Sequence, residues 1–296
     1  MPPLSESTLI DAVKERFRSF KVTLPSAGST TPLNVGQFLQ TAGGLAAPRA
    51  TSVSFASKFP RSTANPQTVP PALIRSASND KVDVDLQAAV NAELTIYMMS
   101  MCHAIVGAHN DWRLTARLQG VQVMAGTAVG GFINGPLLSV NMKQTAPQQG
   151  LWGNAGAYAR AIADGLAACW REWEASVRVP QLLWYPAFAA FPGPVAPPTP
   201  NVPTPMSSLI SSPAALGPSA LKAAMSSKLT QPGPYSDELF TSIATGFSTA
   251  VAQWFPAQMI TNVLAVGPIP AFSPPYVPVG PVIGGSIIDA GPHFHV

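Results

Sequence analysis

A charged helix runs directly into an uncharged, proline-rich ribbon, and this junction constrains the fold more than any other part of the chain. Residues 158–179 read YARAIADGLAACWREWEASVRV, with apolar side chains at every third or fourth position. Residues 182–205 read LLWYPAFAAFPGPVAPPTPNVPTP and carry no charge. Proline fixes φ and removes a hydrogen-bond donor, so this ribbon is extended or turning. Its aromatic content predicts that it is pressed onto another surface.

The junction recurs in the chain as an internal repeat. IADGLAACWREW at 162–173 and IATGFSTAVAQW at 243–254 share Ile, Ala, Gly, a large apolar residue and the final Trp at the same offsets. A looser third copy is a helix at 86–112, which ends on Trp112. Chance likeness between alanine-rich helices is the alternative interpretation. One unit cannot bury both its helix and its ribbon, so repeat units stack, within the chain or between subunits.

These patterns predict an α-rich fold with extended, irregular Pro-rich segments, few short strands, and duplicated helix-plus-prolyl-tail units packed together. Two regions are expected: an N-terminal helix and extended arm at 1–80, and an α-rich body at 81–296. The body holds repeat units at about 86–138, 155–205 and 236–285. Helices are expected at 8–20, 86–112, 158–177, 216–229 and 237–255.

The aromatic residues of the repeats are the expected packing and interface residues. Each repeated helix ends on a tryptophan, and these are predicted to be buried at equivalent junctions. The full set is Trp112, Trp173, Trp254, Phe188, Phe191, Phe272 and Tyr276.

Charged residues are scarce, and their scarcity indicates what kind of partner the protein has. The chain has 17 basic and 14 acidic residues among 296, or 10% charged, against about 25% in typical soluble domains. Such a surface suits a protein that is largely covered by other protein subunits, although a sparsely charged ordinary globule is the alternative. The net charge of +3 is too small and too scattered to indicate a nucleic-acid partner.

Catalytic and metal-binding signatures are not evident. The sequence holds no GxSxG, HExxH, P-loop or GxGxxG pattern. His293 and His295 form H-x-H and would share one side of a strand, but a tail without metal is favoured. His103, in an apolar helix, is interpreted as a structural core histidine. No enzyme activity and no cofactor are therefore expected; the alternative is a hydrolase whose triad is assembled from distant residues.

Membrane and export signals are equally weak. The N-terminus lacks the basic and apolar regions of a signal peptide. The longest apolar run, at 94–108, is too short to span a bilayer, so no spanning segment is expected. A membrane-associated or pore-forming protein remains an alternative. Cys102 and Cys169 lie in apolar helical patterns and are expected to be buried free thiols, with a disulfide as the alternative.

The sparse charge, long Pro/Ser/Thr segments and helix–ribbon units together resemble the structural proteins of phage particles and phage-tail-like injection machines. The resemblance concerns the general character of the whole chain and no specific motif. It implies a non-enzymatic subunit of a large particle, found in the cytoplasm or in the particle, that binds its neighbours through apolar prolyl arms. A single copy whose ribbons fold privately onto its own helices would contradict this expectation.

Overall fold

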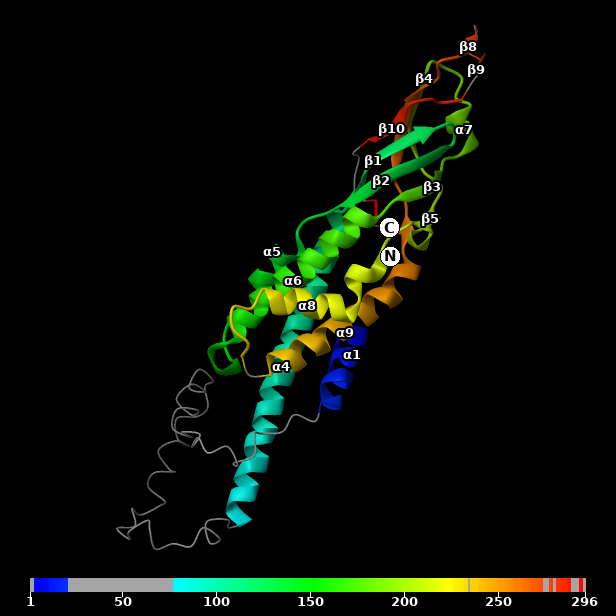
Figure 1. Cartoon of the computed structure of the whole chain (residues 1–296). Coiled ribbons are helices and arrows are strands. Elements are labelled where there is room, and N and C mark those ends of the chain that lie inside the picture. The colour runs from blue at the N-terminus through cyan, green and yellow to red at the C-terminus, as the bar shows by residue number, and fades with distance from the viewer. Residues whose placement is uncertain are drawn as a thin grey trace, which may run out of the picture.

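Helices and strands occupy opposite ends of an elongated molecule (Figure 1). The structure is a computed structural model that describes residues 3–20, 77–233, 235–273, 277–278, 281–288 and 293–294. For 77–87, 152, 272–273 and 277–278 it describes the backbone alone. The arm expected at 21–80 falls largely outside the described residues.

The helical end contains every helix expected from apolar periodicity. Its helices are α1 (Glu6–Ser19), α4 (Ala77–Thr115), α5 (Leu138–Thr145), α6 (Ala155–Ser176), α8 (Pro218–Ser227) and α9 (Ser236–Trp254). Helix α1 packs on α9 and α4, α8 contacts both α6 and α9, and α5 contacts both α4 and α6. Short elements connect the rest: η4 (Leu151–Gly153), α7 (Pro186–Ala189), η5 (Met206–Ser208), η6 (Pro213–Leu216) and η7 (Phe255–Ala257).

The other end is a six-stranded antiparallel sheet in the order β3-β2-β1-β10-β7-β4. Its strands are β1 (Arg117–Met124), β2 (Thr127–Asn134), β3 (Val179–Leu183), β4 (Val195–Pro200), β7 (Leu264–Pro268) and β10 (Gly285–Ile288). Two further pairs are β5 (Thr204–Pro205) with β6 (Met259–Ile260), and β8 (Phe272–Ser273) with β9 (Val277–Pro278).

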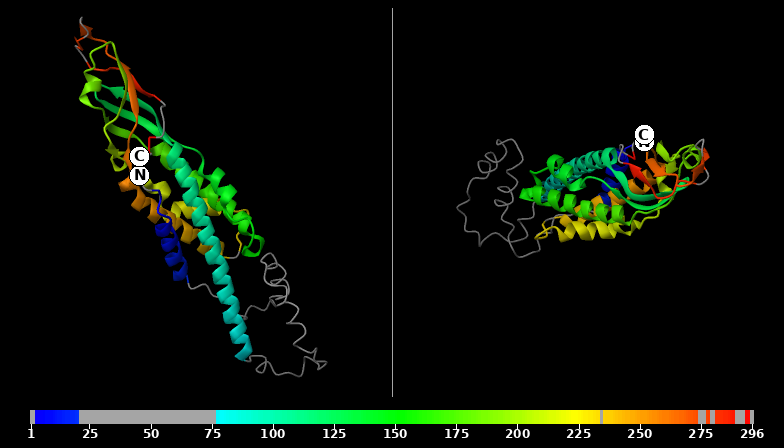
Figure 2. Two further views of the ribbon diagram at one scale, coloured as in Figure 1. Left: turned by 180° about the vertical axis from the view of Figure 1, so that it is seen from behind. Right: turned by 90° about the horizontal axis from the view of Figure 1, so that it is seen from above.

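The sheet curls until its two edge strands meet. An isolated antiparallel bridge joins Trp184 to Asn201, just past the ends of β3 and β4. Beside it, the Val202 N–H donates to the Leu183 carbonyl at 2.7 Å. We call this closed structure the barrel, and its strands follow the order β1-β2-β3-β4-β7-β10 around it. The views in Figure 2 show the strands wrapped at one end of the long axis.

The predicted fold class, α-rich with few short strands, is wrong because the molecule contains this sheet. The error has a physical cause: proline argues against a strand only where the backbone N–H must join a ladder. Pro180 lies in β3, and Pro197, Pro198 and Pro200 lie in β4. These two strands flank the closing seam, where one bridge replaces a full ladder, so the missing donors cost little.

Each expected repeat unit is a helix followed by two barrel strands. The three sets are α4-β1-β2, α6-β3-β4 and α9-β7-β10, in that order around the barrel. The prolyl ribbon at 182–200 is therefore folded within its own chain, which removes it as a free arm for neighbours. Helix α1, grouped with the arm in the sequence, buries Leu9, Val13 and Phe17 in the same core as the body.

At the equivalent glycine of two repeats, a second helix packs closely against the repeat helix. A Cβ on Gly165 of α6 would lie 2.6 Å from the Met225 backbone N of α8. A Cβ on Gly246 of α9 would lie 2.3 Å from Val13 Cγ2 and 3.2 Å from the Leu9 carbonyl of α1. The shared glycine of the IADG and IATG segments therefore has the same role twice, as the point of closest helix approach.

Candidate functional site

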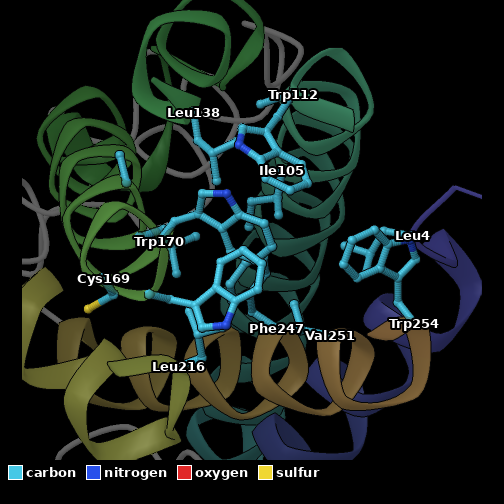
Figure 3. Packing of buried hydrophobic residues seen from close by; sticks show 14 of the residues in the cluster. Leu4, Ile105, Trp112, Leu138, Cys169, Trp170, Leu216, Phe247, Val251 and Trp254 are labelled. Carbon is cyan, nitrogen blue, oxygen red and sulfur yellow. The ribbon is translucent and has the colours of Figure 1, made fainter. Parts of the chain in front are cut away.

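Tryptophans from three helices meet where the helices join the barrel. The Trp112 ring centroid lies 4.9 Å from that of Trp170, 6.1 Å from Trp173 and 6.3 Å from Trp254. All four are at most 5% exposed. Figure 3 shows Trp112, Trp170 and Trp254 on three different helices around one core. The three tryptophans expected at equivalent junctions are thus buried at a single shared one, which we call the tryptophan junction.

A buried carboxyl group ties the tryptophan junction to the barrel. Glu174 is 1% exposed and accepts a hydrogen bond from Trp112 Nε1 at 2.5 Å. Arg171 Nη1 lies 3.2 Å from its other oxygen and also donates to Asn134 Oδ1 of β2 at 3.1 Å. Burial raises the pKa of Glu174 to about 7, against the opposing effects of Trp112 and Arg171. Through Trp112 and Arg171, the Glu174 carboxyl group thus links α4, α6 and β2.

A buried histidine lies among the same rings. His109 is fully buried, with ring centroids 5.3 Å from Trp170 and 4.6 Å from Trp254, both edge to face. Neither of its ring nitrogens has a hydrogen-bond partner among the described residues. Burial, with a smaller effect of the Arg113 charge, lowers the pKa of His109 to about 3. The ring is therefore neutral at pH 7, and contacts to aromatic faces are the interactions open to its N–H.

The other residues that were predicted to pack or to form interfaces differ in their burial. Phe188 is buried, with its ring 6.1 Å from Trp184, and Phe191 is half-buried against the core. Phe272 has only its backbone described, and Tyr276 lies outside the described residues. Cys102 and Cys169 are both free and buried.

The histidines differ from their predicted roles. The interpretation of His103 as a core residue is wrong: its side chain is 76% exposed and pairs with Glu6 at 3.3 Å. Of the two histidines in α4, His109 is the buried one. His293 is buried, and its Nδ1 accepts from the Leu118 N–H at 2.9 Å, while His295 lies outside the described residues. No group of three metal-ligating side chains occurs among the described residues.

The tryptophan junction is a packing contact between helices. His109 is enclosed by its indole rings, whereas His103 pairs with Glu6 at the surface. Burial raises the pKa of the Cys102 thiol to about 12, which keeps it protonated and unreactive at neutral pH. The tryptophan junction therefore holds the helices to the barrel.

Exposed apolar side chains gather at the far rim of the barrel. Ala125 N–H donates to the Val282 carbonyl at 2.6 Å, and Trp184 N–H to the Gly126 carbonyl at 2.9 Å, so the β1–β2 turn adjoins the segment before β10 and the end of β3. The apolar residues at this rim are Met124 (56% exposed), Leu183 (43%), Tyr185 (49%), Val195 (51%) and Ile283 (49%). We call these five residues the uncharged rim. Sequence reasoning missed it because it did not predict the long-range strand pairing that brings these strand ends together.

Charge is nearly absent from the barrel strands. Arg117 is the only charged residue in the six strands, and it begins β1 at the end next to the helices. Ion pairs occur on the helices, such as Lys143–Asp164 and Lys222–Asp237. The molecule is thus polarised along its axis, with a charged helical end and an uncharged barrel end.

Comparison of the chain with protein-family models, curated proteins and solved structures finds no match. Within the described residues, the stretch Ala88–Thr115 of α4 is long and apolar enough to cross a membrane, by length and composition only. The same stretch buries Leu94, Met101 and Trp112 completely against other elements.

Proposed function

We propose that this protein is a non-enzymatic structural subunit of a larger multiprotein assembly, and that the uncharged rim is its contact with neighbouring subunits. The observation that carries the proposal is the cluster of five large exposed apolar side chains at a barrel end without charged strand residues. Large exposed apolar side chains that lie at one end of a molecule favour an interaction site there. Burial of that surface by another subunit offsets its unfavourable exposure to water.

A protein neighbour fits this rim better than a lipid surface. Peripheral membrane sites combine apolar side chains with Lys or Arg that attract anionic lipid headgroups. The barrel strands contain no Lys, and their single Arg, Arg117, lies at the opposite end from the rim. Charge-depleted centres with aromatic and Met side chains are typical of protein–protein interfaces. Met124 and Tyr185 supply those residue types here.

The class of assembly proposed is a phage or phage-tail-like particle, in the cytoplasm or in the finished particle. Its support is the resemblance in composition and in helix–ribbon units; no specific motif adds to it. The contact is proposed at the rim and no longer along free prolyl arms, since the ribbon at 182–200 is folded into the barrel.

The test compares two chains that differ in where they carry a new charge. Met124→Lys alters the uncharged rim, and Val140→Lys alters an equally exposed apolar residue on α5, at 51% against 56% for Met124. Each is expressed in the source cells in place of the wild type, and lysates are sedimented. The wild type and Val140→Lys are expected in a fast-sedimenting particle fraction, and the rim variant in the slow fraction.

Two results would contradict the proposal. In one, the wild-type chain sediments slowly as a small species in its own cells. In the other, the rim variant enters the particle fraction as fully as Val140→Lys does. Flotation of the purified wild type, but not of the rim variant, with zwitterionic phospholipid vesicles would assign the rim to a membrane instead.

A further inference from the structure

The sequence contains a single Asn-Gly pair, Asn134–Gly135, and it lies at the end of β2 beside the tryptophan junction. A glycine after asparagine has no Cβ, so its backbone nitrogen is open to attack the asparagine side chain and close a cyclic imide. Asn134 is the last residue of β2, and Gly135 already lies in the connection to α5. The peptide bond between them is thus the first one beyond the β2 ladder.

Hydrogen bonds hold the Asn134 side-chain amide in one orientation. Its Nδ2 donates to Gln119 Oε1 of β1 at 3.3 Å, and its Oδ1 accepts from Arg171 Nη1 at 3.1 Å. The guanidinium group therefore lies on the oxygen that becomes negative when a nucleophile adds to Asn134 Cγ. A cation in that position stabilises the negative charge as it develops.

The Gly135 backbone faces the buried carboxyl group of Glu174. A Cβ on Gly135 would lie 3.1 Å from Glu174 Oε1. Burial raises the pKa of Glu174 to about 7, and the effects that oppose burial include a hydrogen bond from the Gly135 backbone, whose donor is its N–H. Trp112 Nε1 donates to the same carboxyl group and fixes its position. A base with a pKa near 7 beside an N–H is suited to accept its proton at neutral pH.

We propose that Asn134 is a site of self-catalysed deamidation, with Glu174 as the general base and Arg171 as the group that stabilises the oxyanion. Glu174 takes the Gly135 N–H proton while the Gly135 nitrogen forms a bond to Asn134 Cγ. The Cγ–Nδ2 bond then breaks, and Nδ2 leaves as ammonia with the proton that Glu174 returns. Water opens the five-membered imide to aspartate or isoaspartate at position 134. The net change is the uptake of one water and the loss of one ammonia.

Asn110 provides a control within the same chain. Its Oδ1 also accepts from an arginine, Arg113 Nη2, at 3.0 Å. The next backbone N–H belongs to Asp111, which lies inside α4, where amides donate to carbonyls four residues earlier. Asn110 therefore has the cation on its oxygen without a base on the following N–H, and it should keep its amide.

The reaction alters the link between α6 and β2. Aspartate at position 134 places a second carboxylate beside Arg171, which then divides its hydrogen bonds between that group and Glu174. Isoaspartate adds one atom to the backbone path at the end of β2. The inference does not depend on the proposed function, because Asn134, Gly135 and Glu174 lie outside the uncharged rim. Sedimentation of the rim variant tests one, and the chemistry of Asn134 tests the other.

The first experiment compares the folded chain with a peptide. The purified full chain and a synthetic peptide of residues 131–138 are incubated at pH 8, and peptide mass spectrometry with enzymatic isoaspartate methylation follows each asparagine. Asn134 in the folded chain is expected to deamidate at least about tenfold faster than in the peptide, while Asn110 keeps its amide. A folded chain that reacts no faster than the peptide would overturn the inference, because the fold would then protect the amide.

The second experiment tests the base. Glu174→Gln should slow deamidation of Asn134 by about a hundredfold, whereas Glu172→Gln, at the exposed neighbour, should leave the rate within about twofold. Thermal unfolding checks that both variants are folded. Equal rates for wild type and Glu174→Gln would overturn the role of Glu174.

The dependence of the rate on pH separates the base from a merely structural effect. Arg171 is the charged group that acts on Glu174 among the described residues, and α4 and the end of β2 face it with the uncharged Trp112 indole and Gly135 amide. The wild-type rate should therefore rise through pH 7 and level off above pH 8, once Glu174 is ionised. The rate for Glu174→Gln should keep rising with hydroxide concentration. A wild-type rate that rises in the same way, without levelling, would show that hydroxide is the base and would contradict the proposal.

Discussion

At the scale of single residues, Glu174 gives the fold a defined dependence on pH. Burial raises its pKa from 4.5 to about 7, so the folded chain holds a proton that the unfolded chain has lost between those values. Stability from this group is fully present below pH 4.5 and falls as pH rises to about 7. Glu174→Gln keeps an acceptor for Trp112 and removes the titration.

The expected result is a free energy of unfolding that rises for Glu174→Gln relative to wild type as pH rises from 4.5 to 8. The change should approach about 1.4 kcal/mol for each unit by which the pKa is raised. Urea unfolding at several pH values measures it. The exposed neighbour Glu172 supplies the control, since Glu172→Gln should show no such trend. A difference between Glu174→Gln and wild type that stays constant with pH would show that the carboxyl titrates normally.

His109 has the opposite dependence. Its pKa falls from 6.5 to about 3 in the folded chain, so the unfolded chain takes up a proton that the folded chain excludes. Stability from this group is present above pH 6.5 and is lost as pH falls towards 3. His109→Phe should flatten the acid side of the stability profile. It should also stabilise the fold at pH 7 by about 1 kcal/mol, because it removes two unpartnered ring nitrogens.

The measurement is the urea midpoint of wild type and His109→Phe at pH 7, 5 and 4. Exchange of the exposed His103 for Phe is the control and should leave the acid slope in place. If His109→Phe retains the full acid slope of the wild type, other groups cause it and the buried ring does not.

Glu174 and His109 are two buried residues whose burial the sequence did not predict. The periodicity of α6 placed Trp170 and Trp173 on the apolar face and Glu174 off it. The structure buries Glu174 because the last turn of α6 meets α4 and the barrel, a contact set by tertiary packing. Likewise, periodicity alone could not distinguish His103 from His109, since both lie in one long apolar helix. The repeated terminal tryptophan was the stronger signal, and all three copies are buried.

At the scale of elements, helix packing depends on the repeated glycine. Gly246→Ala places a methyl group 2.3 Å from Val13 Cγ2 and near the backbone of α1. Because backbone atoms cannot turn away as a side chain does, α1 must shift. We expect a loss of about 1–3 kcal/mol in the free energy of unfolding. Chemical denaturation followed by far-UV circular dichroism measures it.

Gly107 provides the control within another helix. A Cβ there would meet nothing within 4 Å, so Gly107→Ala should stabilise by about 0.5–1 kcal/mol through helix propensity. Equal effects of the two substitutions would show that α1 does not press on α9 at Gly246.

Elements also show why the helices were predictable and the barrel was not. The local periodicity of apolar residues predicts a helix, and all five expected helices are present. Apart from the β1–β2 hairpin, most of the barrel pairing joins strands that are distant in sequence; β1 pairs with β10 through Gln122 and Ser286. The prolines in β3 and β4 argued against a strand at either place. They are tolerated there because both strands lie at the seam, which forms only when the barrel closes.

At the scale of the whole molecule, the three units of a helix and two strands share one core. Trp112 from the first unit contacts Trp170 from the second and Trp254 from the third. The barrel likewise closes only when strands from all three units are present. No unit buries its own apolar surface alone, so the described body is expected to unfold as a single cooperative unit.

Trp254→Ala tests this cooperativity. The substitution removes a large buried side chain from the contact of the third unit with the other two, which should cost about 3–5 kcal/mol. If the core is shared, tryptophan fluorescence and far-UV circular dichroism will report one coincident transition at a lower urea concentration. Trp254→Phe, which keeps a ring against His109, should lose much less. A first transition confined to the third unit, with the remaining helical signal lost only at the wild-type midpoint, would show instead that the units are stable independently.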